Sequence, residues 1–249
     1  VRFTSPYSFD FNRNYPHGWR GEHAQQGAGQ FPLSHPETRA VVEAFLARKR
    51  VSIALTYHTY CGAILRPFSG RDDREMNGED LSVFNALAAV GTKHTGYPSM
   101  SVYHGFTHQM TEPVSGGFDD WAYEHAGVYA FTVEMWNVAE RAGVSTPNPP
   151  EFHFLGKMTE QEIKKILDWS DAHPEYGGFA DWESHEHPDL GQLEIGGWDR
   201  VGFWQNPPEP ELERECERNF SFVRAMADST PQLAVEPPTI KRIGNDLWT

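Results

Sequence analysis

The hydrophobic pattern of the chain alternates between strand-like and helix-like segments. Residues 51–57 and 128–135 are apolar runs rich in β-branched and aromatic side chains, which is typical of buried strands. Elsewhere, apolar residues recur at helical spacing. The spacing predicts a first helix of about three turns. Further helices are predicted for residues 79–94, 119–124, 159–172 and 211–227. This alternation of strands and helices predicts a layered α/β fold.

Local signals refine these elements. Ser34 and Glu37 form a capping-box pattern, so we expect the first helix to begin there. Residues 99–104 predict a short strand, and residues 173–210 are expected to be rich in loops. In the last helix, the residues expected to face inward are Phe220, Val223 and Met226.

Composition limits the classes of partner. The 249 residues suffice for one sizeable domain, or for one domain plus part of another. The net charge of −14 repels phosphate backbones, so we do not expect nucleic acid as a partner. Two cysteines are too few for a disulfide framework. No apolar run approaches the length of a membrane span, and no signal peptide is visible.

Glu134 is the one charged residue of the second apolar run. A carboxylate in an apolar strand is costly unless it is paired, bound to a metal or turned toward water. Either Glu134 faces solvent, or it is a general base at the end of a strand.

Histidine and arginine provide further candidates. His58 follows the first apolar run, and ligands of α/β proteins bind at strand ends, so it is either a hydrogen-bonded core residue or a metal ligand. Arg13 lies in an Asn-Arg-Asn turn, either as a surface residue or as a clamp for a carboxylate. His185 and His187, two positions apart, offer a weaker metal clip. The chain has no GxSxG, GxxxxGK[ST] or HExxH motif, which disfavours serine hydrolases, nucleotide-binding proteins and HExxH metalloproteases.

Four stretches together resemble the zinc metallocarboxypeptidase family of the A/B type. In chain order they are Asp10-Phe-Asn-Arg-Asn-Tyr-Pro16, Ser34-His-Pro-Glu-Thr-Arg39, Leu55-Thr-Tyr-His-Thr-Tyr60 with Ile64-Leu-Arg-Pro67, and Gly116-Gly-Phe-Asp-Asp-Trp-Ala-Tyr123 with Phe131-Thr-Val-Glu134. Each motif is weak alone, but their shared order and spacing make the resemblance specific over residues 5–140.

The resemblance implies a domain organisation. Its fold is a mixed β-sheet flanked by helices, here as an incomplete domain. Residues 1–230 correspond to a partial catalytic domain, of which residues 145–230 resemble the C-terminal extension of a bacterial branch. Residues 231–249 are rich in proline and β-like, and are expected to open a truncated β domain.

The resemblance also implies roles for individual residues. His58 aligns with the third zinc ligand, and Glu134 with the general acid/base that deprotonates water and later protonates the leaving amine. Asn12 and Arg13 align with the pair that binds the terminal carboxylate of the substrate.

Two further positions align with substrate subsites. Tyr60 aligns with a tyrosine that lines the subsite next to the scissile bond. Asp119 aligns with the base of the pocket for the terminal side chain, where an acid accompanies a preference for basic residues.

The sequence departs from the family pattern before the Asn-Arg-Asn turn, where the family's carbonyl-polarising arginine is also expected, and at position 112. The first two zinc ligands of the family lie in an H-x-x-E motif before the Asn-Arg-Asn turn, and this sequence has none. Because the chain opens at Val1 rather than Met, we expect a piece of a longer enzyme, with the two missing ligands upstream, rather than a complete pseudoenzyme. Glu112 occupies the place of the family's mobile tyrosine. With one ligand present, we expect little stoichiometric Zn²⁺ on this chain alone.

The expected activity is therefore release of C-terminal residues from peptides or proteins by a zinc-dependent metallocarboxypeptidase. The alternatives are a related zinc amidohydrolase and a non-catalytic peptide-binding pseudoenzyme. The residues do not identify a compartment, and the resemblance alone suggests an extracellular or periplasmic one.

Overall fold

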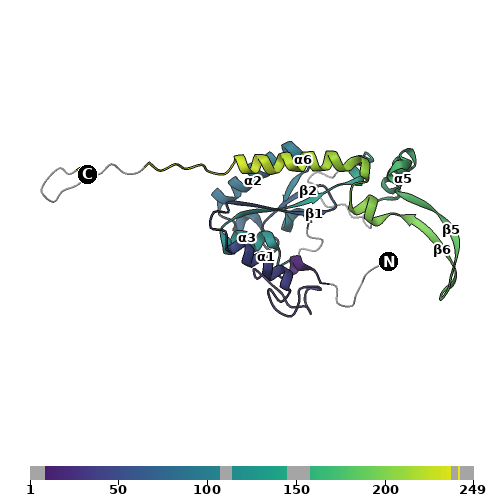
Figure 1. The fold of residues 1–249 in the computed structure, drawn as a ribbon, viewed down its shortest axis with the longest axis horizontal. Coiled ribbons are helices and arrows are strands. Elements are labelled where there is room, and N and C mark those ends of the chain that lie inside the picture. Colours follow the sequence, from purple (N-terminus) through teal and green to yellow (C-terminus); the bar gives the residue numbers. More distant parts are fainter. Residues whose placement is uncertain (1–8, 107–113, 145–157, 237–240, 242–249) are drawn as a thin grey trace.

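The computed structural model describes residues 9–106, 114–144, 158–236 and 241, which form an α/β arrangement (Figure 1). The strands are β1 (Ile53–Thr59), β2 (Ala63–Arg66), β3 (Ser99–Ser101), β4 (Tyr129–Met135), β5 (Phe179–His187) and β6 (Gly191–Trp198). The α-helices are α1 (Pro36–Leu46), α2 (Gly78–Thr95), α3 (Phe118–Ala126), α4 (Val138–Arg141), α5 (Glu160–Ala172) and α6 (Glu209–Asp228). Short 3₁₀ or π turns cover Phe11–Arg13 (η1), Asp73–Glu75 (η2), Val102–Phe106 (η3), Pro174–Tyr176 (η5) and Arg200–Gln205 (η6).

Four strands form a mixed sheet in the order β1-β4-β2-β3. β1 is parallel to β4, β4 is antiparallel to β2, and β2 is parallel to β3. The register of the parallel pair places Thr56 beside Thr132 and His58 beside Glu134. The mixed sheet flanked by helices confirms the expected fold class.

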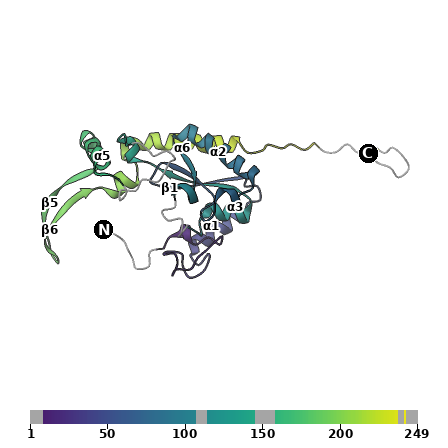
Figure 2. The same ribbon diagram turned by 180° about the vertical axis from the view of Figure 1, so that it is seen from behind.

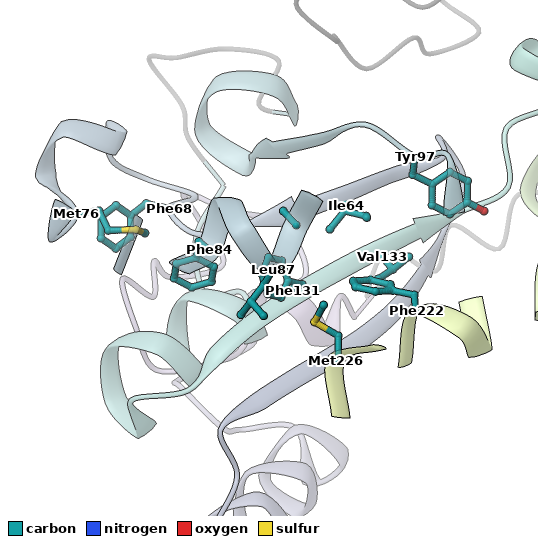
Figure 3. Packing of buried hydrophobic residues seen from close by; sticks show 11 residues of the cluster. Ile64, Phe68, Met76, Phe84, Leu87, Tyr97, Phe131, Val133, Phe222 and Met226 are labelled. Atoms are coloured by element: carbon teal, nitrogen blue, oxygen red, sulfur yellow. The ribbon is translucent and has the colours of Figure 1, made fainter. Parts of the chain in front are cut away.

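Helices cover both faces of this sheet. On one face, α1 and α3 pack through Val42, Phe118 and Trp121 against Ala130 of β4. On the other face, α2 and α6 bury Phe84, Leu87, Phe222 and Met226 against β2 and β4, as Figure 3 shows from close by. Since successive side chains of a strand point to opposite faces, residues 132 and 134 face the α3 side whereas residues 131 and 133 face α2 and α6.

Helix ends follow local sequence signals. The Asn77 side chain accepts a hydrogen bond from the Glu79 amide at 2.8 Å at the start of α2, and Gly96 ends this helix in a left-handed conformation at φ 78°. A reciprocal capping box of Thr159 and Glu162 opens α5.

Several expected elements are confirmed, among them the helices α2 and α5 and the strand β4. The capping box expected at Ser34 is wrong. The N-cap residue of α1 is His35 without a side-chain cap bond, because Pro36 opens the helix and Ser34 Oγ instead accepts a hydrogen bond from Asn14 Nδ2 at 3.1 Å. The short strand expected for residues 99–104 ends at Ser101 and continues as the η3 turn.

The first apolar run forms a strand, but not a buried one. β1 begins at Ile53 and includes His58, and its residues have intermediate or exposed side chains. Within the described part of the chain, β1 pairs with β4 along one edge only. The expectation of a buried strand is therefore wrong, because β1 lies at the edge of the described sheet.

The C-terminal region departs most from expectation. Residues expected to form loops instead form the antiparallel hairpin β5–β6, which extends away from the sheet in Figures 1 and 2. In α6, Met226 faces inward as expected, but Phe220 and Val223 are 62% and 40% exposed. The buried face of α6 combines apolar and polar residues, namely Glu211, Glu215, Asn219, Phe222 and Met226.

The proposed boundary at residue 230 remains a prediction. Residues 231–236 follow α6 without regular secondary structure, and most of residues 237–249 lie outside the described residues. Among the described helices, none combines the length and the apolar character that crossing a membrane requires.

Candidate active site

A small cavity of about 100 Å³ lies where β1 and β4 end, and five of the predicted site residues line it. They are Asn12, Arg13, His58, Asp119 and Glu134. The carboxyl ends of parallel strands meet at one edge of a sheet, which explains why His58 and Glu134 lie together. Tyr60 lies apart from this lining and packs against the aromatic cluster around Trp136. Glu112 lies outside the described residues.

Glu134 is buried in the cavity wall, with 5% of its surface exposed. Within the described part of the chain, its Oε2 atom has no hydrogen-bond partner. Burial raises the pKa of Glu134 to about 8, and the nearby Arg13 charge opposes this shift. A carboxyl group tuned toward neutral pH is suited to both accepting and returning a proton.

His58 faces Glu134 across the parallel pair. Its Nδ1 atom lies 3.9 Å from Glu134 Oε1, which is too far for a hydrogen bond. Burial lowers the pKa of His58, Asp10 opposes this shift, and Arg13 adds to it. A neutral imidazole has a lone pair, which a metal ligand requires.

Asn12 and Arg13 are presented by the η1 turn. The Asp10 side chain caps this turn by accepting a hydrogen bond from the Asn12 amide at 3.0 Å. Asn12 Oδ1 accepts a hydrogen bond from the Phe118 amide at 2.8 Å, so Nδ2 is the donor that Asn12 retains for a ligand. The Arg13 guanidinium donates to Asn12 O at 2.8 Å and lies 3.7 Å from Asp10. These contacts fix the direction of both side chains.

Asn14 supports the same turn, although sequence reasoning gave it no role. Its side chain is fully buried and donates to Ala28 O at 2.6 Å and to Phe31 O at 2.9 Å. Its Oδ1 accepts a hydrogen bond from the His35 amide at 3.1 Å. Asn14 thereby ties the turn to the loop before α1. The available signal was its place as the last residue of the Asn-Arg-Asn motif.

Asp119 lies at the start of α3 and is almost fully buried. Its carboxyl group accepts hydrogen bonds from the Asp120 amide at 3.0 Å and from Thr132 Oγ1 at 3.5 Å. Burial, followed by the neighbouring Asp120, raises the pKa of Asp119. Thr132 is a second residue that sequence reasoning missed, and its place two positions before Glu134 was the available signal.

The donors in this cavity account for only part of a metal site. A catalytic zinc ion takes three protein ligands, commonly histidines and a carboxylate. The described residues contain no group of three or more His, Cys, Asp or Glu side chains suited to a metal. The neutral His58 and the unpartnered Glu134 oxygen fit the edge of a metal centre, but these residues do not form one by themselves.

The weaker metal clip expected at His185 and His187 gains no support from geometry. Both residues lie on the exposed hairpin. The Nδ1 atom of His187 accepts hydrogen bonds from the amides of Asp189 and Leu190, at 3.1 and 3.2 Å. The Nδ1 atom of His187 is therefore engaged in hydrogen bonds within the turn of the hairpin.

The fold and the cavity define an α/β protein with an imidazole and a buried carboxyl group at adjacent strand ends. The sequence model of the zinc carboxypeptidase family matches residues 3–166, which is more than half of the chain. The chain therefore belongs to the zinc carboxypeptidase family. This confirms the resemblance drawn from the four motifs.

Individual relatives match the same part of the chain. Carboxypeptidase B2 of Bos taurus is 32% identical over 135 residues, covering 51% of this chain and 31% of that protein. Carboxypeptidase B of Homo sapiens is 31% identical over 140 residues, with the same coverage. A crystal structure of thrombin-activatable fibrinolysis inhibitor matches with a TM-score of 0.42 and 30% identity, covering 52% of this chain and 34% of that one. The chain thus spans less than a third of the length of the two carboxypeptidases, Carboxypeptidase B2 and Carboxypeptidase B.

Proposed function

We propose that the protein to which this chain belongs is a zinc-dependent metallocarboxypeptidase that releases C-terminal residues from peptides. One observation carries this proposal. A buried Glu134, a neutral His58 and the Asn12–Arg13 pair line the same cavity, although they come from three separate segments. Membership of the zinc carboxypeptidase family supports it.

Asn12 and Arg13 select the substrate in this proposal. The planar guanidinium of Arg13 matches a carboxylate with two parallel hydrogen bonds, and Asn12 Nδ2 adds a further donor. Asp10 and the Phe118 amide hold these groups in place before the substrate arrives. A free C-terminus is thereby distinguished from an internal peptide bond.

Glu134 moves the proton. Its carboxylate accepts a proton from the attacking water and then donates it to the leaving amine, so that the carboxylate is restored after each turnover. His58 provides one ligand of the zinc, and the other ligands are expected from a part of the protein outside this chain. When bound, zinc supplies a Lewis acid that polarises the scissile carbonyl and lowers the pKa of water.

Asp119 sets the side-chain preference. Its carboxyl group lines the cavity beside Thr132, and burial disfavours its ionised form. A lysine or arginine side chain would provide the charge that stabilises ionised Asp119. We therefore propose a preference for basic C-terminal residues.

The test uses the full-length protein and two matched peptides that end in lysine, one with a free carboxylate and one with a C-terminal amide. We expect the acid to be cleaved at least about 100-fold faster, because only the acid engages Arg13. Arg13→Ala should remove most of this difference. Equal cleavage of both peptides by the wild-type protein would instead favour the zinc amidohydrolase, and cleavage of neither would favour the peptide-binding pseudoenzyme.

A further inference from the structure

The end of β4, two residues beyond Glu134, is held in an unusual conformation. Trp136 has a φ of 65°. This backbone conformation favours glycine and is strained for a residue as bulky as tryptophan. Its ring is fully buried. Both of its N–H groups donate hydrogen bonds, the backbone amide to Tyr97 Oη at 2.9 Å and the indole Nε1 to Phe203 O at 2.7 Å.

The Tyr97 hydroxyl connects this backbone to α6. It accepts hydrogen bonds from the Trp136 amide and from Arg218 Nη2, the latter at 2.5 Å, and it donates to Glu215 Oε2. The single donor and both lone pairs of the hydroxyl are therefore engaged. Tyr97 is fully buried at one end of the core shown in Figure 3.

A buried ion pair completes the network. Arg218 and Glu215 approach to 2.5 Å, with 13% and 3% of their side-chain surfaces exposed, and the Arg218 guanidinium lies 4.2 Å above the Tyr97 ring. A buried ion pair is often no more stabilising than apolar residues of the same volume. This ion pair instead contributes orientation, because Glu215 and Arg218 fix the position of the Tyr97 hydroxyl.

We propose that Tyr97, Glu215 and Arg218 are positioning residues for Glu134, and this rests on the proposed function. Glu215 and Arg218 hold the Tyr97 hydroxyl, which accepts the hydrogen bond of the Trp136 amide. The held amide sets where β4 ends and where the Glu134 carboxylate lies relative to His58. Without the tyrosine hydroxyl, the strained backbone at Trp136 is free to relax toward an ordinary φ. A shift of about 1 Å in a catalytic group costs about 100-fold in rate.

This proposal gives α6 a role beyond covering the sheet. The helix lies more than 70 residues after Glu134 in the sequence, yet two of its side chains, Glu215 and Arg218, bind the Tyr97 hydroxyl that accepts the hydrogen bond of the Trp136 amide. Removal of α6 is then expected to affect proton transfer and not only stability.

The test compares two variants of the full-length protein. Tyr97→Phe removes only the hydroxyl, and we expect kcat to fall about 10- to 100-fold with an unchanged KM, because the Asn12–Arg13 pair is untouched. Met226→Ala is the matched control, since it weakens the packing of α6 in the same core without touching the network. It should lower the melting temperature and leave kcat unchanged at a temperature where the protein is folded.

Hydrogen exchange of the Trp136 amide provides a readout independent of activity. It should accelerate in Tyr97→Phe and stay slow in Met226→Ala. A wild-type kcat in Tyr97→Phe, or an equal loss of kcat in Met226→Ala, would overturn the proposal. If Tyr97→Phe does not fold, Arg218→Lys decides, because it keeps the charge and loses the guanidinium fork. An unchanged kcat in Arg218→Lys would also overturn the proposal.

A structural measurement separates this proposal from the proposed function. If the wild-type protein releases no C-terminal residue, the carboxypeptidase activity is refuted. A crystal structure of Tyr97→Phe then still shows whether the Glu134 carboxylate has moved, and an unmoved carboxylate would refute the positioning role.

Discussion

The strands β1 and β4 are similar in sequence but differ in their environment. Each has seven residues, with threonine at the fourth position and a titratable residue at the sixth. Their register pairs Thr56 with Thr132 and His58 with Glu134. Yet β4 is buried between β1 and β2, whereas β1 lies at the edge of the described sheet.

The titratable residues of the two strands both respond to burial. Burial is the main cause of both pKa shifts, but it acts on groups of opposite charge. It raises the pKa of the acid Glu134 and lowers the pKa of the base His58, so each is driven toward its neutral form. Burial therefore favours a protonated carboxyl group on one strand and a neutral imidazole on the other.

The largest effect is expected from removal of the proton carrier. Glu134→Gln in the full-length protein should lower kcat about 1,000- to 10,000-fold, because the amide neither accepts nor returns the proton. Zinc content should stay at the wild-type level, since His58 is intact. Peptide hydrolysis and metal analysis check both points. Turnover within tenfold of wild type would contradict the role of Glu134.

The next effect concerns stability in this 249-residue chain alone, treated with a chelator. Because the folded pKa of Glu134, about 8, lies above its ordinary value of 4.5, its ionisation favours the unfolded state. Its destabilising effect should grow from about pH 4.5 to about pH 8. Glu134→Gln should thus be more stable than wild type by on the order of 3 kcal/mol near pH 9, and equal to it near pH 4.

His58 provides the opposite pH dependence. Its folded pKa is lowered, so protonation favours the unfolded state and stability should fall as the pH drops below the ordinary value near 6.5. His58→Gln should remove this acid-side loss, which is smaller because β1 is more exposed. Urea unfolding across the pH range measures both effects. Identical pH profiles for the two variants would show that the strands do not differ in this way.

The fourth effect concerns the metal. His58→Ala should weaken zinc binding in the full-length protein at least about 100-fold, since loss of a direct ligand exceeds the effect of losing a supporting hydrogen bond. Tyr57→Ala is the matched control, because its side chain points to the opposite face of the same strand. Competition with a zinc chelator measures both variants. Equal zinc affinities would exclude His58 as a ligand.

The smallest effect compares the two strands as parts of the core. Val133 and Tyr57 are register partners, but Val133 is fully buried and Tyr57 is 39% exposed. Val133→Ala should lower the free energy of unfolding by about 2 kcal/mol, whereas Tyr57→Ala should lower it by about 1 kcal/mol or less. Urea unfolding of the 249-residue chain checks the order. A larger loss in Tyr57→Ala would mean that β1 contributes more to the core than its burial indicates.

The same comparison explains what the sequence could predict. The apolar runs identified both strands and placed His58 and Glu134 at their ends. However, the two runs have the same pattern, so periodicity did not distinguish the edge strand from the central one. That distinction depends on which strands pair, and pairing is decided by contacts distant in sequence.

Other differences between the sequence-based predictions and the structure also have non-local causes. The η1 motif predicted Asn12 and Arg13, but not the bond from the Phe118 amide to Asn12, because the two residues lie 106 positions apart. In α6, apolar spacing favoured Phe220 and Val223, whereas the buried Glu215 turns the helix toward Tyr97. The hairpin was missed because both of its faces are largely exposed, so its sequence lacks a clear apolar alternation.

The bond between Asn12 and the Phe118 amide has an evolutionary consequence. One side chain helps to bind the terminal carboxylate in the proposed site, and it also caps the helix that carries Asp119. Asn12 therefore helps to hold the distance from the proposed carboxylate anchor to the proposed base of the side-chain pocket. Changes at position 119 can alter which side chain is accepted while the anchor stays in place. Loss of Asn12, in contrast, would disturb both functions at once, so selection is expected to vary the pocket and to preserve this asparagine.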